Sequence, residues 1–414
     1  MSARRVYLIS SVAQGIFLSL IFTVNQLYRV TTVGLTPLQL VLVGTTLEAT
    51  VFIFEIPTGV VADVFSRRLS TIIGIFLFGV GFIIEGAIPL FAAVLMAQVV
   101  WGLGWTFISG ARSAWIADEV GTDKVGPIYM RGTQFHQAGS LLGIPLGVAL
   151  GRIALNLPIL VGGGLFLVLG LFLILAMPEE GFKPTPPGER QTWGVLKSTL
   201  HDGAKLIRSR PTLMIFLVIA LFVGLYSEGY DRLSEAHFLG NFTFPTVGNL
   251  DVVTWFGIMR VGTTLSVLGV SEIVKRRLDT ENQAKLSRVL QAIYGLVVIG
   301  LLTFALTENF GIALLATWLV DTARVVSFPL NTTWINHHID SKVRATVLSM
   351  TSQVDALGQM IGGPIIGLIG TLRSLRAALS TSGLILSPVL FMYERVYRKN
   401  LAHQLEHQSI SIEE

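Results

Sequence analysis

The chain has 414 residues, of which 52% are hydrophobic and only 14% are charged, and its formal net charge is +4. A water-soluble domain of this length could not hide so much apolar surface, so the composition excludes a water-soluble globular fold. The sequence contains no cysteine, which excludes disulfides, thiolate catalysis and thiolate metal sites.

The apolar residues are spread over about a dozen segments, each close to the roughly 20 residues that a helix needs to cross a bilayer. We predict an all-α membrane protein with twelve transmembrane helices, at residues 6–28, 38–61, 69–88, 91–117, 128–153, 157–177, 212–239, 252–274, 284–306, 310–336, 345–372 and 377–397. No pattern of alternating strands competes with this interpretation.

Prolines and charges interrupt the apolar pattern between the sixth and seventh segments. This interruption predicts an N-terminal six-helix bundle over 1–177, a cytoplasmic linker over 178–210, and a C-terminal six-helix bundle with a cytoplasmic tail over 211–414. Within the linker, residues 192–208 place apolar side chains at helical spacing among basic ones. That pattern indicates either a short interfacial helix or a solvated linker helix.

Basic residues gather on one side of this topology, and the opposite helix ends hold only Arg29, Arg152, Arg373 and Arg376. Because positively charged loops stay in the cytoplasm, we expect both termini to be cytoplasmic and the protein to lie in the cell membrane. No nucleic-acid motif accompanies these bases, so we expect no nucleic-acid partner.

A charged turn at residues 59–71 returns in degraded form at residues 272–280. In each copy an acid is followed four and five residues later by two arginines; the residues are Asp63, Arg67 and Arg68 in the first copy and Glu272, Arg276 and Arg277 in the second. The two halves are thus predicted to be parallel repeats, an architecture typical of secondary carriers with a binding site between the repeats.

A single offset of 219 residues supports the same repeat. It places Trp115 on Trp334, Gln134 on Gln353, Gly139 on Gly358, Gly143 on Gly362 and Pro145 on Pro364. Two pseudo-symmetric six-helix bundles related by an axis along the membrane normal would produce this correspondence.

The first charged turn, Gly59-x-x-x-Asp63-x-x-x-Arg67-Arg68, resembles the signature loop of the major facilitator superfamily, with Ser66 where that family usually has glycine. The resemblance extends over essentially the whole chain. It implies that Asp63 holds one side of the carrier shut by meeting the start of helix eleven near Arg344. The alternative is that the two arginines are only topology signals.

Helix five carries small residues at four-residue spacing around a proline: Gly139, Gly143, Pro145, Gly147 and Gly151. This run resembles the glycine-proline signature of drug/proton antiporters, although Ile144 separates glycine from proline. A second copy on helix eleven comprises Gly358, Gly362 and Pro364. These residues suit either hinges between the halves or ordinary close helix packing.

Three further phrases, at residues 54–59, 109–119 and 226–233, resemble the tetracycline- and macrolide-efflux branch of that superfamily. The resemblance does not carry a substrate with it, since related branches export siderophores, lipids and other amphiphiles.

An ionised side chain at the bilayer centre costs at least about 2.5 to 3.5 kcal/mol, so intramembrane charges mark a partner or a cavity. Glu55 on helix two and Arg112 on helix four are expected at similar depth. We predict an ion pair between them near the inner gate, with a purely structural pair as the alternative.

In the second half, Arg260, Asp321 and Arg324 fall nearer the midplane. A carboxylate held between cations stays ionised until they move apart, which makes Asp321 our first proton-coupling candidate and either arginine its release switch. Asp355 and its repeat partner His136 are the other titratable candidates, although a lone histidine is more often a packing residue.

Helix seven is unusually charged. Glu228 is a candidate cavity residue, whereas Asp231 to His237 are expected in outer-gate pairs or in a solvated mouth. Glu85 on helix three is expected to be a structural partner. Aromatic residues that could line an amphiphile pocket are Trp101, Trp105, Phe107, Tyr226, Trp255, Trp318 and Trp334. Packing and interfacial anchoring are the alternatives for each of them.

No enzyme constellation is found. Adjacent His337 and His338 point in different directions and lack further spaced ligands, so we expect no metal. The glycines at 162–164 are not followed by Lys-Ser or Lys-Thr, so no phosphate loop is encoded. We therefore expect no cofactor and no enzymatic activity.

Together these patterns predict a monomeric carrier in the lipid bilayer that exports a small amphiphilic, drug-like molecule in exchange for protons by alternating access. The alternatives are a proton-coupled symporter or an exporter of an endogenous lipid or siderophore. A non-transporting membrane receptor or scaffold is more remote, because it would not need paired intramembrane charges and repeated hinge glycines.

Overall fold

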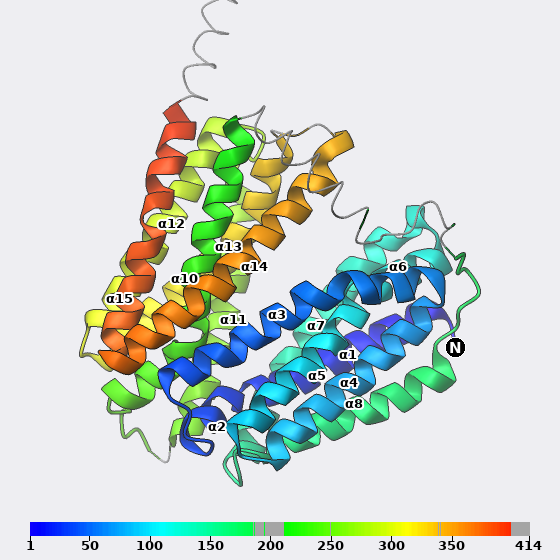
Figure 1. The fold of residues 1–414 in the computed structure, drawn as a ribbon, viewed down its shortest axis with the longest axis horizontal. Helices are drawn as coiled ribbons and strands as arrows, with labels where there is room; N and C mark the ends of the chain where they lie inside the picture. Colours follow the sequence, from blue (N-terminus) through cyan, green and yellow to red (C-terminus); the bar gives the residue numbers. More distant parts are fainter. Residues whose placement is uncertain are drawn as a thin grey trace, which may run out of the picture. The chain divides into compact units, whose positions relative to one another are not determined.

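The computed structural model describes residues 1–184, 186, 194, 211–248, 250–337, 339 and 341–398, and all regular structure in these residues is helical. The helices of the first half are α1 (Ala3–Phe22), α2 (Asn25–Thr31), α3 (Pro37–Val64), α4 (Arg67–Ala87), α5 (Phe91–Ser109), α6 (Ala111–Val120), α7 (Thr122–Gly151) and α8 (Leu157–Ala176). The helices of the second half are α10 (Pro211–Asn241), α11 (Val252–Arg277), α12 (Gln283–Leu306), α13 (Phe310–His337), α14 (Ser341–Leu372) and α15 (Leu375–Leu386) (Figure 1).

Eleven helical stretches in the described part of the chain are long and apolar enough to cross a membrane. They include α1 with α2 as one stretch, α5 with α6 as another, and α15 continued to Arg398. The twelfth helix, α7, is as long as the others but less apolar, because Gln134, His136 and Gln137 interrupt it. The predicted all-α fold of twelve membrane helices is confirmed.

Three of the helices predicted as continuous are interrupted, one of them at Ser387, where α15 ends within the helix predicted over 377–397. Between α1 and α2, the hydroxyl of Thr23 donates to the carbonyl of Ser19 at 2.6 Å, which offers the backbone an alternative to the helical ladder. Between α5 and α6 the break falls at Gly110, where no side chain stabilises a helical backbone.

Contacts within the chain define two compact units. The first comprises Met1–Lys197 and Thr246–Val261, and the second comprises Ser198–Pro245 and Gly262–Glu414. The beginning of α11 belongs to the first unit, where Arg152 pairs with Asp251 at 2.9 Å. The sequence analysis did not predict that α11 would be divided between the two units. The helix predicted over 192–208 lies outside the described residues, apart from Gly194.

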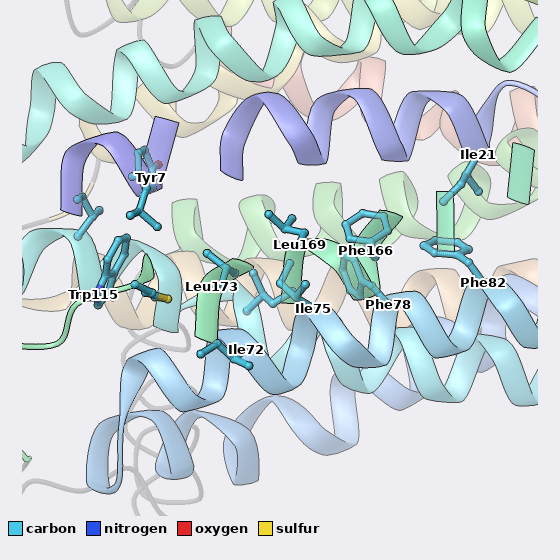
Figure 2. Packing of buried hydrophobic residues seen from close by; sticks show 14 of the residues in the cluster. Tyr7, Ile21, Ile72, Ile75, Phe78, Phe82, Trp115, Phe166, Leu169 and Leu173 are labelled. Atoms are coloured by element: carbon cyan, nitrogen blue, oxygen red, sulfur yellow. The ribbon is translucent and has the colours of Figure 1, made fainter. Parts of the chain in front are cut away.

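In the first unit, α1 packs on α7, and α4 packs on both α5 and α8 (Figure 1). Aromatic rings fill the space between these helices (Figure 2). The ring centre of Phe166 on α8 lies 5.4 Å from that of Phe78 and 6.1 Å from that of Phe82, both on α4. In the second unit, α10 packs on α14 and α15, and α12 packs on α13 and α15.

The glycines of α7 allow α1 to approach closely. A Cβ atom added to Gly139 would lie 2.4 Å from the carbonyl oxygen of Val12, and one added to Gly143 would lie 2.4 Å from that of Ile16. The repeat does the same on α14, where a Cβ on Gly362 would lie 2.1 Å from the carbonyl oxygen of Leu225. Close packing therefore accounts for these glycines, while their role as hinges stays a prediction.

One ion pair is completely enclosed in the first unit. Arg29 and Glu85 have side-chain exposures of 2% and 0%, and the guanidinium donates to both carboxylate oxygens, at 2.7 and 3.1 Å. Asn25 and Gln98 donate to the same carboxylate at 3.0 and 3.2 Å. Glu85 therefore has the structural partner that the sequence analysis expected.

The glycine contact predicts a selective loss of stability. We expect Gly143→Ala to cost about 1 to 3 kcal/mol, because the added methyl group meets backbone rather than a movable side chain. Gly164→Ala on α8 is the matched control, since nothing lies within 4 Å of a Cβ there. Thermal unfolding midpoints in one detergent measure both, and equal midpoints would contradict the packing argument.

The enclosed ion pair predicts a second effect. Glu85→Gln leaves the Arg29 guanidinium without its counter-charge, and we expect a loss of about 3 to 5 kcal/mol in unfolding free energy. Replacing both residues by methionine removes the stranded charge and should recover much of that loss. A double variant as unstable as Glu85→Gln would show that the pair itself, and not the stranded charge, determines stability.

Candidate functional site

The turn between α3 and α4 is the site of the first charged motif. Arg67 forms an ion pair with Asp118 at the end of α6 and lies 3.7 Å from Asp63. Glu179 accepts hydrogen bonds from the hydroxyl of Ser66 at 2.6 Å and from the backbone N–H of Arg68 at 2.8 Å. A carboxylate thus satisfies the first turn of α4, as the helix dipole favours.

The contacts of this turn are made by Ser66, Arg67 and Arg68 of the motif. A Cβ on Gly59 would meet nothing within 4 Å, so no close contact requires glycine there. The proposed meeting of Asp63 with the start of α14 joins residues of different units and stays a prediction.

The second copy of the motif lacks the acid that Arg67 uses. Glu272 and Arg276 pair at 2.6 Å, four residues apart on α11, but their side chains are 49% and 75% exposed. The 219-residue offset places His337 where the first half has Asp118. An exposed pair of this kind contributes about 0.3 to 0.5 kcal/mol, so the copy is a weak surface feature, and Arg277 beside it is also exposed.

The predicted ion pair between Glu55 and Arg112 is wrong. Arg112 instead donates to α1, at 2.6 Å to the hydroxyl of Ser11 and 3.1 Å to the carbonyl of Tyr7, and its guanidinium lies 4.6 Å from the Tyr7 ring centre. Glu55 is exposed on α3, and no described cation pairs with it. Arg112 lies in α6, beyond the break at Gly110, where the hydroxyl and carbonyl oxygens of α1 are within reach.

His136 lies on the face of α7 that packs against α1. A Cβ on Gly15 would lie 2.1 Å from the carbonyl oxygen of His136, so the two backbones are in close contact. This placement agrees with a packing role, and a role of His136 in coupling stays a prediction.

The second unit contains a cavity of about 810 Å³. Helices α10, α13 and α14 supply most of its lining, with single residues from α11 and α12 and with Tyr393 from the stretch after α15. Four charged side chains line it: Asp231, Asp321, Arg324 and Asp355. Because the cavity combines apolar walls with a few convergent charges, it is the candidate binding site.

Arg324 is bound to α10 and not to Asp321. Its guanidinium donates to both carboxylate oxygens of Asp231, at 2.5 and 2.8 Å. The ring centres of Tyr226 and Tyr230 lie 5.7 and 5.2 Å from the Cζ atom of the same guanidinium. Asp231 is thus the counter-ion of the cavity's arginine, and a role of this pair in an outer gate stays a prediction.

Asp321 is held by hydroxyl groups. It accepts a hydrogen bond from Tyr230 at 2.8 Å and a longer one from Thr263 at 3.3 Å. Arg324 is therefore not its ion-pair partner, and a pairing of Asp321 with Arg260 stays a prediction. Arg260 belongs to the first unit and does not line the cavity, and Arg324 pairs with Asp231 because the carboxylate of that residue faces it from α10.

Of the three carboxylates that line the cavity, Asp355 has the fewest hydrogen bonds and ion pairs. It accepts one hydrogen bond, from the side-chain amide of Gln359 one turn further along α14, at 2.8 Å. Within the described residues, no cation lies at ion-pair distance from it. It is thus an acid in the middle of a membrane helix with only a neutral donor beside it.

At one end of the cavity, Asn331 links two tyrosines. It donates to the hydroxyl of Tyr294 at 2.7 Å and accepts from the hydroxyl of Tyr393. The ring of Trp334 lies 4.9 Å from that of Tyr393 and 4.6 Å from that of Phe216. Apart from Trp334, this group was missed in the sequence, although the 219-residue offset that places Asn331 on Arg112 could have indicated it.

Of the seven aromatic residues predicted to line a pocket, Tyr226 and Trp334 line this cavity. Trp101 instead packs among the rings of α1 and α4 and donates to Gln98 at 2.9 Å, and Trp318 covers Gly262 of α11. The other three, which are Trp105, Phe107 and Trp255, lie in the first unit and not at this cavity. Aromatic side chains in a helix bundle serve packing as readily as binding, and the sequence does not separate the two.

Glu228 does not line the cavity either. It is 2% exposed and accepts a hydrogen bond from Arg232, one turn along α10, at 2.7 Å. No cluster of three or more potential metal ligands occurs in the described residues, and His338, beside His337 at the end of α13, lies outside them.

The Arg324 and Asp231 contact predicts strong coupling between the two positions. Asp231→Asn or Arg324→Gln leaves one charge unpaired in the bundle, whereas the double variant leaves none. We expect a double-mutant cycle of unfolding free energies to give a coupling energy of about 0.5 to 3 kcal/mol. Additive single effects would show that the two side chains do not depend on each other.

Comparison with known proteins agrees with this architecture. The chain is 22% identical over 343 residues to the uncharacterised MFS-type transporter YxaM of Bacillus subtilis (strain 168), and the match covers 82% of each chain. A solved mutant of the nucleoside transporter NupG has a TM-score of 0.76 at 14% identity, covering 96% of this chain and 100% of that chain. A mutant of the peptide transporter POT in complex with sulfate has a TM-score of 0.73 at 14% identity, covering 96% of this chain and 94% of that chain.

These solved structures share the fold of this chain, and their low identities carry no substrate across. The sequence pattern of the Major Facilitator Superfamily matches residues 6–363, which is most of the chain. Twelve membrane helices with that match make this a multi-pass membrane protein with the fold of a transporter rather than of an enzyme. The chain belongs to the Major Facilitator Superfamily.

Proposed function

We propose that this protein is a proton-coupled secondary active transporter that exports small amphiphilic, drug-like molecules by alternating access. The observation that carries the proposal is the cavity of about 810 Å³ in the second unit, with aromatic walls and three carboxylates around one arginine. Its volume falls within the range of about 300 to 1,000 Å³ that holds small-molecule ligands.

The coupling proton is assigned to Asp355. An acid inside a membrane helix is costly to keep ionised, and a carboxylate without a cationic partner loses the fewest interactions when it takes up a proton. Both carboxylate oxygens of Asp231 accept hydrogen bonds from Arg324, so protonation of Asp231 would break that ion pair. Asp321, which accepts two hydroxyl hydrogen bonds, is the alternative.

One proton per cycle supplies enough free energy for export. A pH difference of one unit across the membrane corresponds to about 1.4 kcal/mol, which supports roughly tenfold accumulation of an uncharged substrate. In this mechanism the proton and the substrate reach the cavity alternately, from opposite sides of the membrane. Protonation of Asp355 and binding of the substrate then favour opposite states of the carrier.

The charged turn at Asp63 and Arg67 is proposed to stabilise one of those states. In this scheme both termini and the turn lie in the cytoplasm, the protein works as a monomer in the cell membrane, and Asp63 meets the start of α14 when the cytoplasmic side is closed. The glycine contacts between α1 and α7, and between α10 and α14, would keep each unit rigid while the units move.

Symport, or export of an endogenous lipid or siderophore, would use the same cavity and the same acid. A receptor or scaffold would not move a compound across the membrane. The direction of transport distinguishes export from symport. Movement of drug-like compounds distinguishes drug export from export of an endogenous lipid or siderophore.

We expect a pH gradient across proteoliposomes to drive the movement of lipophilic dyes and tetracyclines, and we expect Asp355→Asn to abolish it. Dye fluorescence inside the vesicles measures the movement. Asp321→Asn tests the alternative acid, and Glu308→Gln is the matched control because that carboxylate is 85% exposed, between α12 and α13.

Gradient-driven transport that survives in Asp355→Asn and is lost in Asp321→Asn would transfer the coupling role to Asp321. Transport that survives in both variants would place the coupling group outside the cavity. If no compound moves under either direction of the gradient, drug efflux is the wrong function for this carrier.

A further inference from the structure

We infer that the cavity of the second unit selects organic cations, and that the positive centre of the substrate pairs with the carboxylates of Asp355 and Asp321. This inference rests on the proposed function and adds to it the charge of the substrate.

The charges around the cavity are unbalanced. Among the described residues that line it, three are aspartates and one is an arginine, which gives a formal charge of −2 when every acid is ionised. Inside a low-dielectric bundle such an excess is unfavourable until a counter-charge arrives. The negative charge of the cavity therefore favours the binding of a positive group. Either a proton or a cationic substrate can supply that group.

Among the described residues that line the cavity, the one cation that could bind an anionic substrate, Arg324, is already paired. Both terminal nitrogens of Arg324 already donate to Asp231, and the rings of Tyr226 and Tyr230 lie beside the guanidinium. A carboxylate or phosphate would have to displace Asp231 from an ion pair. That exchange would leave Asp231 unpaired and would increase the negative charge of the cavity.

The two remaining acids can accept further hydrogen bonds or ion pairs. Asp355 uses one oxygen for Gln359, and each oxygen of Asp321 accepts one hydroxyl. An ionised carboxylate can accept about four hydrogen bonds, so both groups retain unused capacity toward the cavity that they line.

The walls suit the remainder of such a substrate. Phe328 and Val325 of α13 line the cavity with 76% and 51% of their surfaces exposed, whereas Tyr294, Tyr393 and Trp334 are buried in its wall. Aromatic faces attract cations as well as apolar rings, with about 0.5 to 2 kcal/mol per contact. A lipophilic cation with aromatic substituents therefore matches both the charge and the surface of the cavity.

This arrangement also explains how a proton could be exchanged for the substrate. Both ligands neutralise the same carboxylate, so the binding of one opposes the binding of the other. Cation binding at neutral pH should release protons, and acidification should weaken cation binding.

The test compares two ions of the same shape and opposite charge, tetraphenylphosphonium and tetraphenylborate. Equilibrium binding to the purified full-length protein is measured in detergent, with protein-free micelles subtracted. We expect the phosphonium to bind and the borate not to bind. We also expect phosphonium affinity to fall at least tenfold in Asp355→Asn and to stay unchanged in Glu308→Gln.

The pH dependence gives a second readout that does not depend on folding of the variants. In the unmodified protein, phosphonium affinity should decrease as the pH falls, and binding should release protons into a weakly buffered solution. In Asp355→Asn the remaining affinity should depend less on pH. A fluorescence-detected elution profile identical to that of the unmodified protein establishes that this variant is folded.

Equal or tighter binding of the borate, or binding of neither ion, would overturn the inference. Those outcomes leave gradient-driven export intact if the dyes still move in proteoliposomes. Conversely, selective phosphonium binding without proton release would support a cation site while contradicting proton exchange at Asp355. The two proposals can therefore fail separately.

Discussion

A charge inside a membrane bundle needs a counter-charge or a full set of hydrogen bonds, and the two units of this protein meet that requirement in three ways. Arg29 and Glu85 enclose each other completely, with Asn25 and Gln98 satisfying the remaining carboxylate capacity. Arg112 is surrounded by neutral oxygens of α1. The cavity of the second unit satisfies its arginine but leaves its other carboxylates with neutral donors, and this difference makes it the functional candidate.

The two halves have kept their packing and changed their polar sites. Trp115 and Trp334 are both buried, and the glycines of α7 and α14 press against the backbones of α1 and α10 in the same manner. At the polar positions, Asn331 stands where the first half has Arg112, and Asp355 stands where it has His136. Shape complementarity between helices tolerates few substitutions, whereas a cavity wall can change its charge without disturbing the fold.

The membrane helices were predictable because hydrophobic length is a property of consecutive residues. The glycine positions were predictable because a 219-residue repeat preserves them. The partners of the charges were not, since a helix turns by 100° per residue and a small error in rotation or in a helix break changes which neighbour a side chain reaches. Glu55 illustrates this: the break at Gly110 separates α5 from α6, and Arg112 in α6 binds α1 instead.

The sequence by itself determined the fold class, the repeat and the family resemblance, because composition, apolar length and motif spacing are written along the chain. It also identified Asp321, Arg324, Asp355 and Tyr226, which line the cavity. Only the tertiary structure decided that Asp231 neutralises Arg324, that Asp321 is held by hydroxyls, and that Asp355 has no cationic partner within the described residues. The physical reason is that pairing depends on which faces of α10, α13 and α14 meet, and packing of the whole unit sets those faces.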